Sequence, residues 1–95
     1  MSQDILKVAY SIEFEKILKR ISKKDKRILD YLEVQIEKTI RFPEIGKPLR
    51  YTLKNRRRLD VGSFVLIYEF SENEVRFIDF DHHDKIYKKY KFKYK

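Results

Sequence analysis

The chain has 95 residues, 40% of them charged, and 23 Lys and Arg outnumber 15 Asp and Glu to give a formal net charge of +8. This length allows one small domain, spanning residues 1–95, and the complete lack of cysteine excludes disulfides and thiolate chemistry. No stretch approaches the roughly 20 apolar residues of a membrane span. The N-terminus lacks a signal-peptide pattern, so we expect a cytoplasmic protein without membrane contacts. The positive charge favours polyanionic partners, or it only keeps the surface soluble.

The N-terminal half predicts one strand followed by two helices. Residues 5–10 are short and apolar-rich, as in a β-strand, and Ser11 can cap the helix that follows. Apolar residues then recur at helical spacing in two segments, first at Phe14, Ile17, Leu18 and Ile21, and then at Ile28, Leu32, Ile36 and Ile40. Because a short polar segment joins the segments and Pro43 ends the second, we expect an antiparallel helix hairpin.

The C-terminal half predicts an antiparallel sheet. Residues 57–61 form a candidate strand, Gly62-Ser63 a tight turn, and residues 64–70 a nearly continuous apolar run typical of a central strand. A turn at residues 71–73 leads to a partner strand over residues 74–81. The Lys- and Tyr-rich tail fits an edge strand, a short helix or a mobile tail. The predicted fold is therefore α+β: an N-terminal strand, a helix hairpin, and a three- to four-stranded antiparallel sheet with the helices packed on one face.

A run of cations precedes the first strand of the sheet. Lys54, Arg56, Arg57 and Arg58 lie within five residues. If this segment is extended, Arg56 and Arg58 point to one face and Arg57 to the other, so that two guanidinium groups can converge on a phosphate backbone. The alternative is a solvated run of charge.

The two histidines of the chain are neighbours at the end of the last predicted strand. His82 and His83 are flanked by aspartates, which raises the question of a metal site. Neighbouring residues of a strand face opposite sides, so one ion cannot easily take both histidines, and we expect no metal. One histidine backed by a carboxylate suits general acid-base chemistry, whereas the alternative is a surface or capping histidine.

Aromatic residues and lysines alternate in the C-terminal tail. Cations that follow a backbone and aromatic faces that stack on bases are what single-stranded RNA requires, and Lys85, Tyr87, Lys88 and Tyr90 offer both, with Phe92 and Tyr94 beyond them. An amphipathic edge strand would show the same alternation. The sequence has no glycine-rich phosphate loop and no dinucleotide fingerprint, so we expect no cofactor.

The segment GKPLRYTLKNRRRLDVGSFVLIYEFSENEVRFIDFDHHDKIY, from Gly46 to Tyr87, resembles the C-terminal two-thirds of RelE-type toxins of the RelE/ParE superfamily. The resemblance implies a toxin of a type II toxin-antitoxin module that enters the ribosomal A site and cleaves messenger RNA by attack of the ribose 2′-OH. It also implies a RelB-like antitoxin in a heterotetrameric complex, and operator DNA bound only through that antitoxin.

The resemblance assigns roles to individual positions. It places Arg58, His83 and Tyr87 in the catalytic centre, with Arg58 gripping the RNA backbone and Tyr87 stacking on or activating the nucleotide. It matches Lys54 and His82 to basic positions of the family, and these join the RNA or phosphate contacts that the cation run and the tail suggest at Arg56, Arg57, Lys85, Lys88 and Tyr90. Two positions depart from the family pattern: Val65 replaces an arginine that stabilises the phosphate, and Asp60 replaces a second strand cation. The alternatives are a ParE-like inhibitor of DNA gyrase without catalysis, and a degenerate toxin that binds only its antitoxin and DNA.

Overall fold

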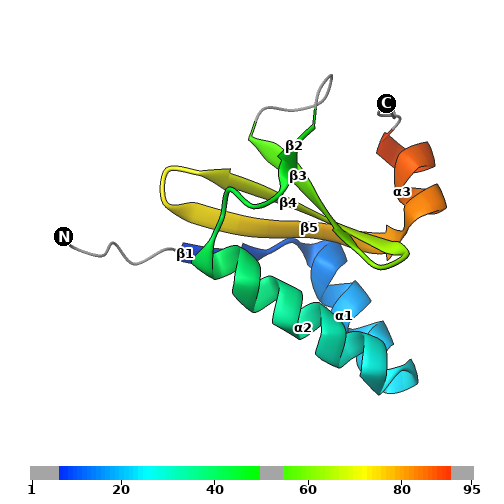
Figure 1. Cartoon of the computed structure of the whole chain (residues 1–95). Helices are drawn as coiled ribbons and strands as arrows, with labels where there is room; N and C mark the ends of the chain where they lie inside the picture. Colours follow the sequence, from blue (N-terminus) through cyan, green and yellow to red (C-terminus); the bar gives the residue numbers. More distant parts are fainter. Residues whose placement is uncertain (1–6, 50–54, 91–95) are drawn as a thin grey trace.

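The computed structural model describes residues 7–49 and 55–90 (Figure 1). The elements in chain order are β1 (Lys7–Tyr10), α1 (Ile12–Lys24), α2 (Lys26–Arg41), β2 (Lys47–Pro48), β3 (Arg56–Val61), β4 (Phe64–Ser71), β5 (Glu74–His82) and α3 (His83–Tyr90). The strands and helices expected from the sequence are all present, and the tail forms a helix as far as Tyr90. Three parts of the predictions lie outside the described residues: the start of the first strand, Lys54, and the tail from residue 91 onward.

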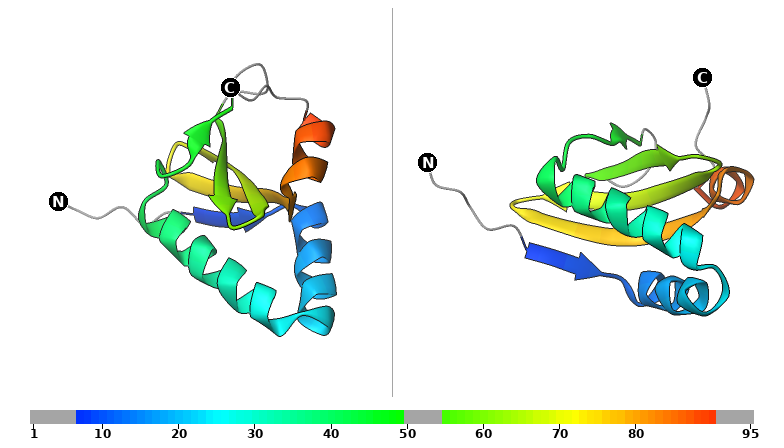
Figure 2. Two further views of the ribbon diagram at one scale, coloured as in Figure 1. Left: turned by 45° about the vertical axis from the view of Figure 1, so that its right-hand side comes forward. Right: turned by 60° about the horizontal axis from the view of Figure 1, so that its bottom comes forward.

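Two polar caps define the helix pair. The Ser11 hydroxyl accepts a hydrogen bond from the Phe14 amide at 3.0 Å, as predicted, and donates one to the Ile78 carbonyl of β5 at 3.0 Å. Asp25 ends α1 by donating its amide to the Ile21 carbonyl, and begins α2 by accepting from the Ile28 amide. The two helices diverge from Asp25 as a V (Figure 2), so the start of α1 is fixed to the sheet and the junction extends away from it.

The sheet has five strands in the order β1-β5-β4-β3-β2. β3, β4 and β5 pair antiparallel, as expected, and β2 pairs antiparallel with β3 as a strand that the sequence analysis did not predict. β1 adds a fifth strand that pairs parallel with β5, from Lys7 opposite Glu74 to Tyr10 opposite Phe77. This pairing joins residues almost 70 positions apart, and the helix pair forms the connection that parallel strands require. The central position of β4 agrees with its apolar run, because Val65 to Tyr68 have no exposed surface.

The two faces of the sheet are covered by different helices. The main core lies between the sheet and the α1–α2 pair and contains Phe14, Ile17, Leu32, Ile36, Val61, Leu66, Tyr68, Val75, Phe77 and Phe80. A smaller cluster of Val65, Ile67 and Ile86 lies under α3 on the opposite face. The helix pair therefore packs on one face, as predicted, and α3 covers part of the other. No helix within the described ranges is long and apolar enough to cross a membrane.

Candidate functional site

The inner face of α3 carries the aromatic side chains that the sequence singled out. Ile86 is fully buried, and His83, Tyr87 and Tyr90 are partly buried at the helical spacing that places all four on one side. Lys85 is exposed, as is Lys88. α3 thus turns one histidine and two tyrosines toward the sheet and two of the predicted RNA-binding lysines toward solvent.

Arg58, Tyr87 and His83 meet between β3 and α3. The Arg58 guanidinium donates a hydrogen bond from Nη1 to the Tyr87 hydroxyl at 2.8 Å, and its carbon lies 5.8 Å from the centre of the Tyr87 ring. The His83 and Tyr87 rings are in contact, with their centres 4.5 Å apart. The sequence analysis assigned these three residues to catalysis. Arg58 lies at least 25 positions before the other two in the sequence, and the packing of α3 brings them into one cluster of a cation, a phenol and an imidazole. We call these three residues the Arg58 cluster.

Asp60 lies at the edge of the Arg58 cluster. Its Oδ1 atom is 3.4 Å from Nη1 of Arg58, and its side chain is 52% exposed. A pair at this distance with an exposed partner contributes about 0 to 1 kcal/mol, because water and salt screen it. Asp60 thus lowers the local positive charge at this position, yet it leaves a pair weak enough for a phosphate group to replace.

A second cation of β3 contacts α3 further along the helix. Arg56 binds Glu69 through Nη2 at 2.8 Å and Nε at 3.3 Å, and its guanidinium carbon lies 5.9 Å from the centre of the Tyr90 ring. Its charge is already matched by a carboxylate that is only 30% exposed. Arg56 therefore shares a face with Arg58, as predicted, but its main contacts are within the protein.

Asp79 of β5 anchors the end of α3. Its side chain is 4% exposed, and its Oδ2 accepts from the Tyr90 hydroxyl at 2.8 Å and from Lys89 Nζ at 2.7 Å. Burial is the main cause of the raised pKa of Tyr90, and its hydrogen bond to Asp79 raises that pKa further. For Lys89, its own hydrogen bond to Asp79 is the main cause of the raised pKa. Tyr90 therefore keeps its proton at neutral pH and acts as a fixed contact. The sequence analysis missed Asp79, although a carboxylate inside a strand that is otherwise rich in apolar residues was the available signal.

Arg57 and His82 lie apart from the Arg58 cluster. Arg57 points to the opposite face, as the strand alternation predicts, and donates to the carbonyls of Gly46 at 2.7 Å and Glu44 at 3.3 Å. The exposed His82 ring stacks on Phe64, with ring centres 4.3 Å apart, and Phe64 packs against the main core under the helix pair. His83 alone of the two histidines contacts Tyr87 in the described part of the chain.

Val65, where the resemblance implies that the family has a phosphate-stabilising arginine, is a core residue of this fold. Its side chain has no exposed surface and packs with Ile67 and Ile86 beneath α3. An apolar residue at this position joins the helix to the sheet and supplies no charge. The positive charge of the Arg58 cluster therefore comes from β3.

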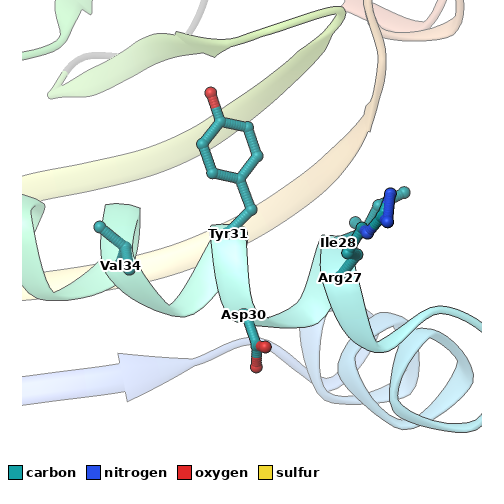
Figure 3. A pocket seen from close by; sticks show the side chains of 5 residues that line it. All are labelled: Arg27, Ile28, Asp30, Tyr31 and Val34. Carbon is teal, nitrogen blue, oxygen red and sulfur yellow. The ribbon is translucent and has the colours of Figure 1, made fainter.

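The surface hollow on α2 does not combine groups for chemistry. It is open and apolar, and it is lined by Arg27, Ile28, Asp30, Tyr31 and Val34. Figure 3 shows Tyr31 and Asp30 pointing to opposite sides of the helix, so their polar atoms do not converge. Nor does any group of three His, Asp or Glu side chains in residues 7–49 and 55–90 come together as a metal site.

Comparisons with known proteins show the family to which the chain belongs. A family model described as the ParE toxin of the parDE type II toxin-antitoxin system matches residues 8–87. A Methanocaldococcus jannaschii protein that carries the toxin name RelE4 is 42% identical over 89 residues, which cover 86% of this chain and 95% of that protein. Both the family match and this relative extend over most of the chain.

Solved structures show the same fold. The toxin-antitoxin complex DinJ-YafQ of E. coli contains a chain that matches with a TM-score of 0.75 at 21% identity, over 88% of this chain and 99% of that one. The YoeB/ParE toxin from Agrobacterium tumefaciens matches with a TM-score of 0.74 at 15% identity, over 82% and 99% of the two chains. Together with the family match, these likenesses confirm the resemblance seen in the sequence: the chain belongs to the ParE toxin family of type II toxin-antitoxin systems, within the RelE/ParE superfamily.

Proposed function

We propose that this toxin is a ribosome-dependent endoribonuclease that cuts messenger RNA in the A site and thereby inhibits translation. The observation that carries the proposal is the Arg58 cluster, in which the Tyr87 phenol contacts both the guanidinium of Arg58 and the imidazole of His83. The resemblance to RelE-type toxins supports the same reaction.

The reaction requires three kinds of group. The ribose O2′ forms a bond to the neighbouring phosphorus while the bond from phosphorus to O5′ breaks, which yields a 2′,3′-cyclic phosphate and a free 5′-hydroxyl. A base takes the 2′ proton, an acid gives a proton to O5′, and a cation stabilises the charge that develops on the phosphate oxygens. Arg58 supplies the cation, and Tyr87 and His83 are the two groups that transfer protons.

Dependence on the ribosome follows from the small number of groups in the cluster. With Val65 in place of an arginine, one stabilising donor is missing, and the loss of one such donor typically costs about 2.7 to 4 kcal/mol of transition-state stabilisation. A ribosome that holds the message with its 2′-oxygen in line with the phosphate supplies the orientation that the toxin lacks. We therefore expect slow cutting of free RNA and faster cutting of translated messages.

We also propose that a RelB-like antitoxin inhibits the toxin in a heterotetrameric complex and alone contacts the operator DNA. The DinJ-YafQ structure shows that a chain of this fold is found in a toxin-antitoxin complex. An acidic antitoxin would complement the net charge of +8. Addition of the purified antitoxin should stop cutting at a one-to-one ratio, and continued cutting at excess antitoxin would contradict the assignment.

A tyrosine substitution tests the nuclease directly. A translation reaction with a defined message receives the purified chain or its Tyr87→Phe variant, and primer extension maps the new 5′ ends. We expect faster cutting of translated messages than of free RNA, and a loss of activity on the order of 10²-fold for Tyr87→Phe, because the hydroxyl that transfers a proton is removed. Tyr31→Phe is the matched control, because Tyr31 is 49% exposed on α2. Equal activity of both variants would exclude the Tyr87 hydroxyl from the reaction.

The family match favours a second candidate, a ParE-like inhibitor of DNA gyrase that does no chemistry. A supercoiling assay with purified gyrase separates the two candidates. Inhibition that survives Tyr87→Phe, without cuts in the message, would favour gyrase. Neither cuts nor inhibition would indicate a degenerate toxin that binds only its antitoxin and DNA.

A further inference from the structure

Side chains of β3 and β4 fix the chain that leads into β2. The Tyr68 hydroxyl accepts a hydrogen bond from the Gly46 amide at 2.8 Å and donates one to the Pro43 carbonyl at 2.7 Å. Arg57 donates to the Gly46 carbonyl at 2.7 Å. The backbone of Lys47, the first residue of β2, is therefore held in place by the sheet.

Lys47 lies directly opposite Arg58. The two residues pair across β2 and β3, and β2 forms the edge of the sheet (Figure 1). Directly opposite residues of an antiparallel pair project to the same face, with their Cβ atoms about 4.5 to 5.5 Å apart. Leu49, two positions after Lys47, packs with the apolar cluster beneath α3, which identifies this face. The exposed Lys47 side chain thus projects beside the Arg58 cluster.

This placement of two cations is unfavourable for the toxin alone. Like charges directly opposite each other in a sheet repel. In the described part of the chain Lys47 forms no ion pair, and the carboxylate that contacts Arg58 is the exposed Asp60 at 3.4 Å. At the other edge of the sheet, Lys7 pairs with Glu74, a residue of opposite charge. An anionic group between Lys47 and Arg58 would turn their repulsion into attraction.

The other cations of β3 are less suited to hold that anionic group with Arg58. Arg56 binds Glu69 at 2.8 Å, so its charge is already matched within the protein. Arg57 lies on the opposite face and donates to backbone carbonyls. Lys47 thus combines the correct face, exposure to solvent and proximity to Arg58.

We propose that Lys47 is a further catalytic residue, and that Lys47 and Arg58 hold the phosphate at the cut between them. The assignment rests on the proposed nuclease function. Val65 leaves β4 without a charge for the phosphate, and β3 lies between β4 and β2, so Lys47 supplies charge from the other side of Arg58. Its ammonium group acts as a point charge on a phosphate oxygen. Lys47 transfers no proton: it stabilises the charge that develops as the bond to O2′ forms and the bond to O5′ breaks.

Lys47→Gln tests the proposal, with Lys47→Arg and Lys7→Gln as matched variants. Lys47→Arg keeps a cation at the same position, and Lys7→Gln removes an exposed lysine from the opposite edge strand, β1. Cutting of a translated message is measured over a range of message concentrations, which separates kcat from KM. Because both lysines are exposed, the melting temperatures of all three variants should stay within about 3 °C of the wild type.

Lys47→Gln should lower kcat about 10-fold to 10²-fold and change KM less, because the charge on the phosphate oxygens grows in the transition state. The loss stays at or below the range typical of a buried donor, since water screens an exposed lysine. Lys47→Arg should recover most of the activity, and Lys7→Gln should cut like the wild type. An unchanged kcat in Lys47→Gln, or equal losses in Lys47→Gln and Lys47→Arg, would overturn the proposal.

A double variant tests whether the two cations hold the same phosphate. If they do, the loss in Lys47→Gln with Arg58→Gln is smaller than the product of the two single losses, because groups that act as a unit are not additive. A combined loss equal to that product would place Lys47 on a separate phosphate and overturn the shared contact.

An RNA that cannot be cut separates this outcome from that of the nuclease proposal. A short single-stranded RNA with 2′-O-methyl groups has no 2′-hydroxyl for attack, and its affinity is measured over a fourfold range of salt. Loss of one phosphate contact lowers the slope of log affinity against log salt by about 0.7, so Lys47→Gln should weaken about 2.5-fold less than the wild type. If the wild type makes no cuts, a lower slope in Lys47→Gln alone would support the phosphate site, and equal slopes in Lys47→Gln and Lys7→Gln would overturn it.

Discussion

Asp79→Ala is expected to destabilise the toxin more than any other change to an acidic residue outside the helix caps. The substitution removes the buried acceptor of the Tyr90 hydroxyl, of Lys89, and, through Oδ1, of the Phe80 amide at 2.9 Å. A hydrogen bond to a charged group contributes about 1.5 to 3 kcal/mol, which applies to Tyr90. Lys89 is 48% exposed, so its share is about 1 kcal/mol or less, because water replaces the carboxylate.

Together, the lost hydrogen bonds should lower the free energy of unfolding of Asp79→Ala by about 3 kcal/mol. For a chain of this size that is a large part of the roughly 5 to 14 kcal/mol of unfolding free energy, and it lowers the melting temperature by about 15 °C. Because the lost contacts hold α3, amide hydrogen exchange should accelerate first in residues 83–90, and message cutting should fall as Tyr87 loses its position against Arg58.

Urea unfolding of Asp79→Ala beside Asp81→Ala provides the measurement. Asp81 is a matched control, since within residues 7–49 and 55–90 its carboxylate accepts one hydrogen bond, from the neighbouring His82 amide at an exposed position. We expect Asp81→Ala to lower the free energy of unfolding by less than about 1 kcal/mol. If the two variants unfold at the same urea concentration, or if α3 exchanges no faster in Asp79→Ala, the anchoring role of Asp79 is refuted.

Three further predictions concern the packing and charge around the sheet. Gly46→Ala places a methyl group 2.7 Å from the Tyr68 hydroxyl and 2.8 Å from the Arg58 carbonyl, so it should destabilise the fold by about 1 to 3 kcal/mol in urea; wild-type stability would show that the loop can move aside. Because the pKa of Tyr90 is raised in the folded chain, its contribution to the free energy of unfolding is complete below about pH 10 and is lost as the pH rises above that value. Melting temperatures between pH 9 and 12 should therefore fall more steeply for the wild type than for Tyr90→Phe, and parallel curves would contradict this. Asp60→Asn removes the carboxylate 3.4 Å from Arg58, so the KM for the ribosome-bound message should fall about twofold to fivefold with stability nearly unchanged, whereas a higher KM would show that Asp60 assists binding.

The elements of this fold were predictable because their signals are local. Ser11 and the apolar spacing of the two helices define α1 and α2, and the run around Val65 indicates a strand buried on both faces. The parallel pairing of β1 with β5 was not predictable, since nothing within residues 7–10 specifies a partner so distant in sequence. The tail was ambiguous because its lysines alternate with aromatic residues, which hides the helical spacing of His83, Ile86, Tyr87 and Tyr90.

In the candidate site, too, local patterns were predictable and contacts that depend on tertiary packing were not. Strand alternation predicted that Arg56 and Arg58 share a face and that Arg57 does not, and the structure confirms it. The family resemblance supplied Tyr87 and His83, and the contact of Tyr87 with Arg58 depends on how α3 packs. Asp79 was missed because its partners, Lys89 and Tyr90, come into reach only once the helix turns back over β5.

The chemical identity of the RNA ends tests the central claim most directly. Messages cut during translation by the wild type and by Arg58→Gln are recovered, and mass spectrometry identifies both termini at each cut. If the Arg58 cluster directs attack by the 2′-hydroxyl, wild-type fragments end in a 2′,3′-cyclic phosphate and begin with a 5′-hydroxyl, and Arg58→Gln yields about 10²-fold fewer of them. Fragments with 5′-phosphate ends, or equal yields from both proteins, would show that this cluster is not the centre that cuts the message.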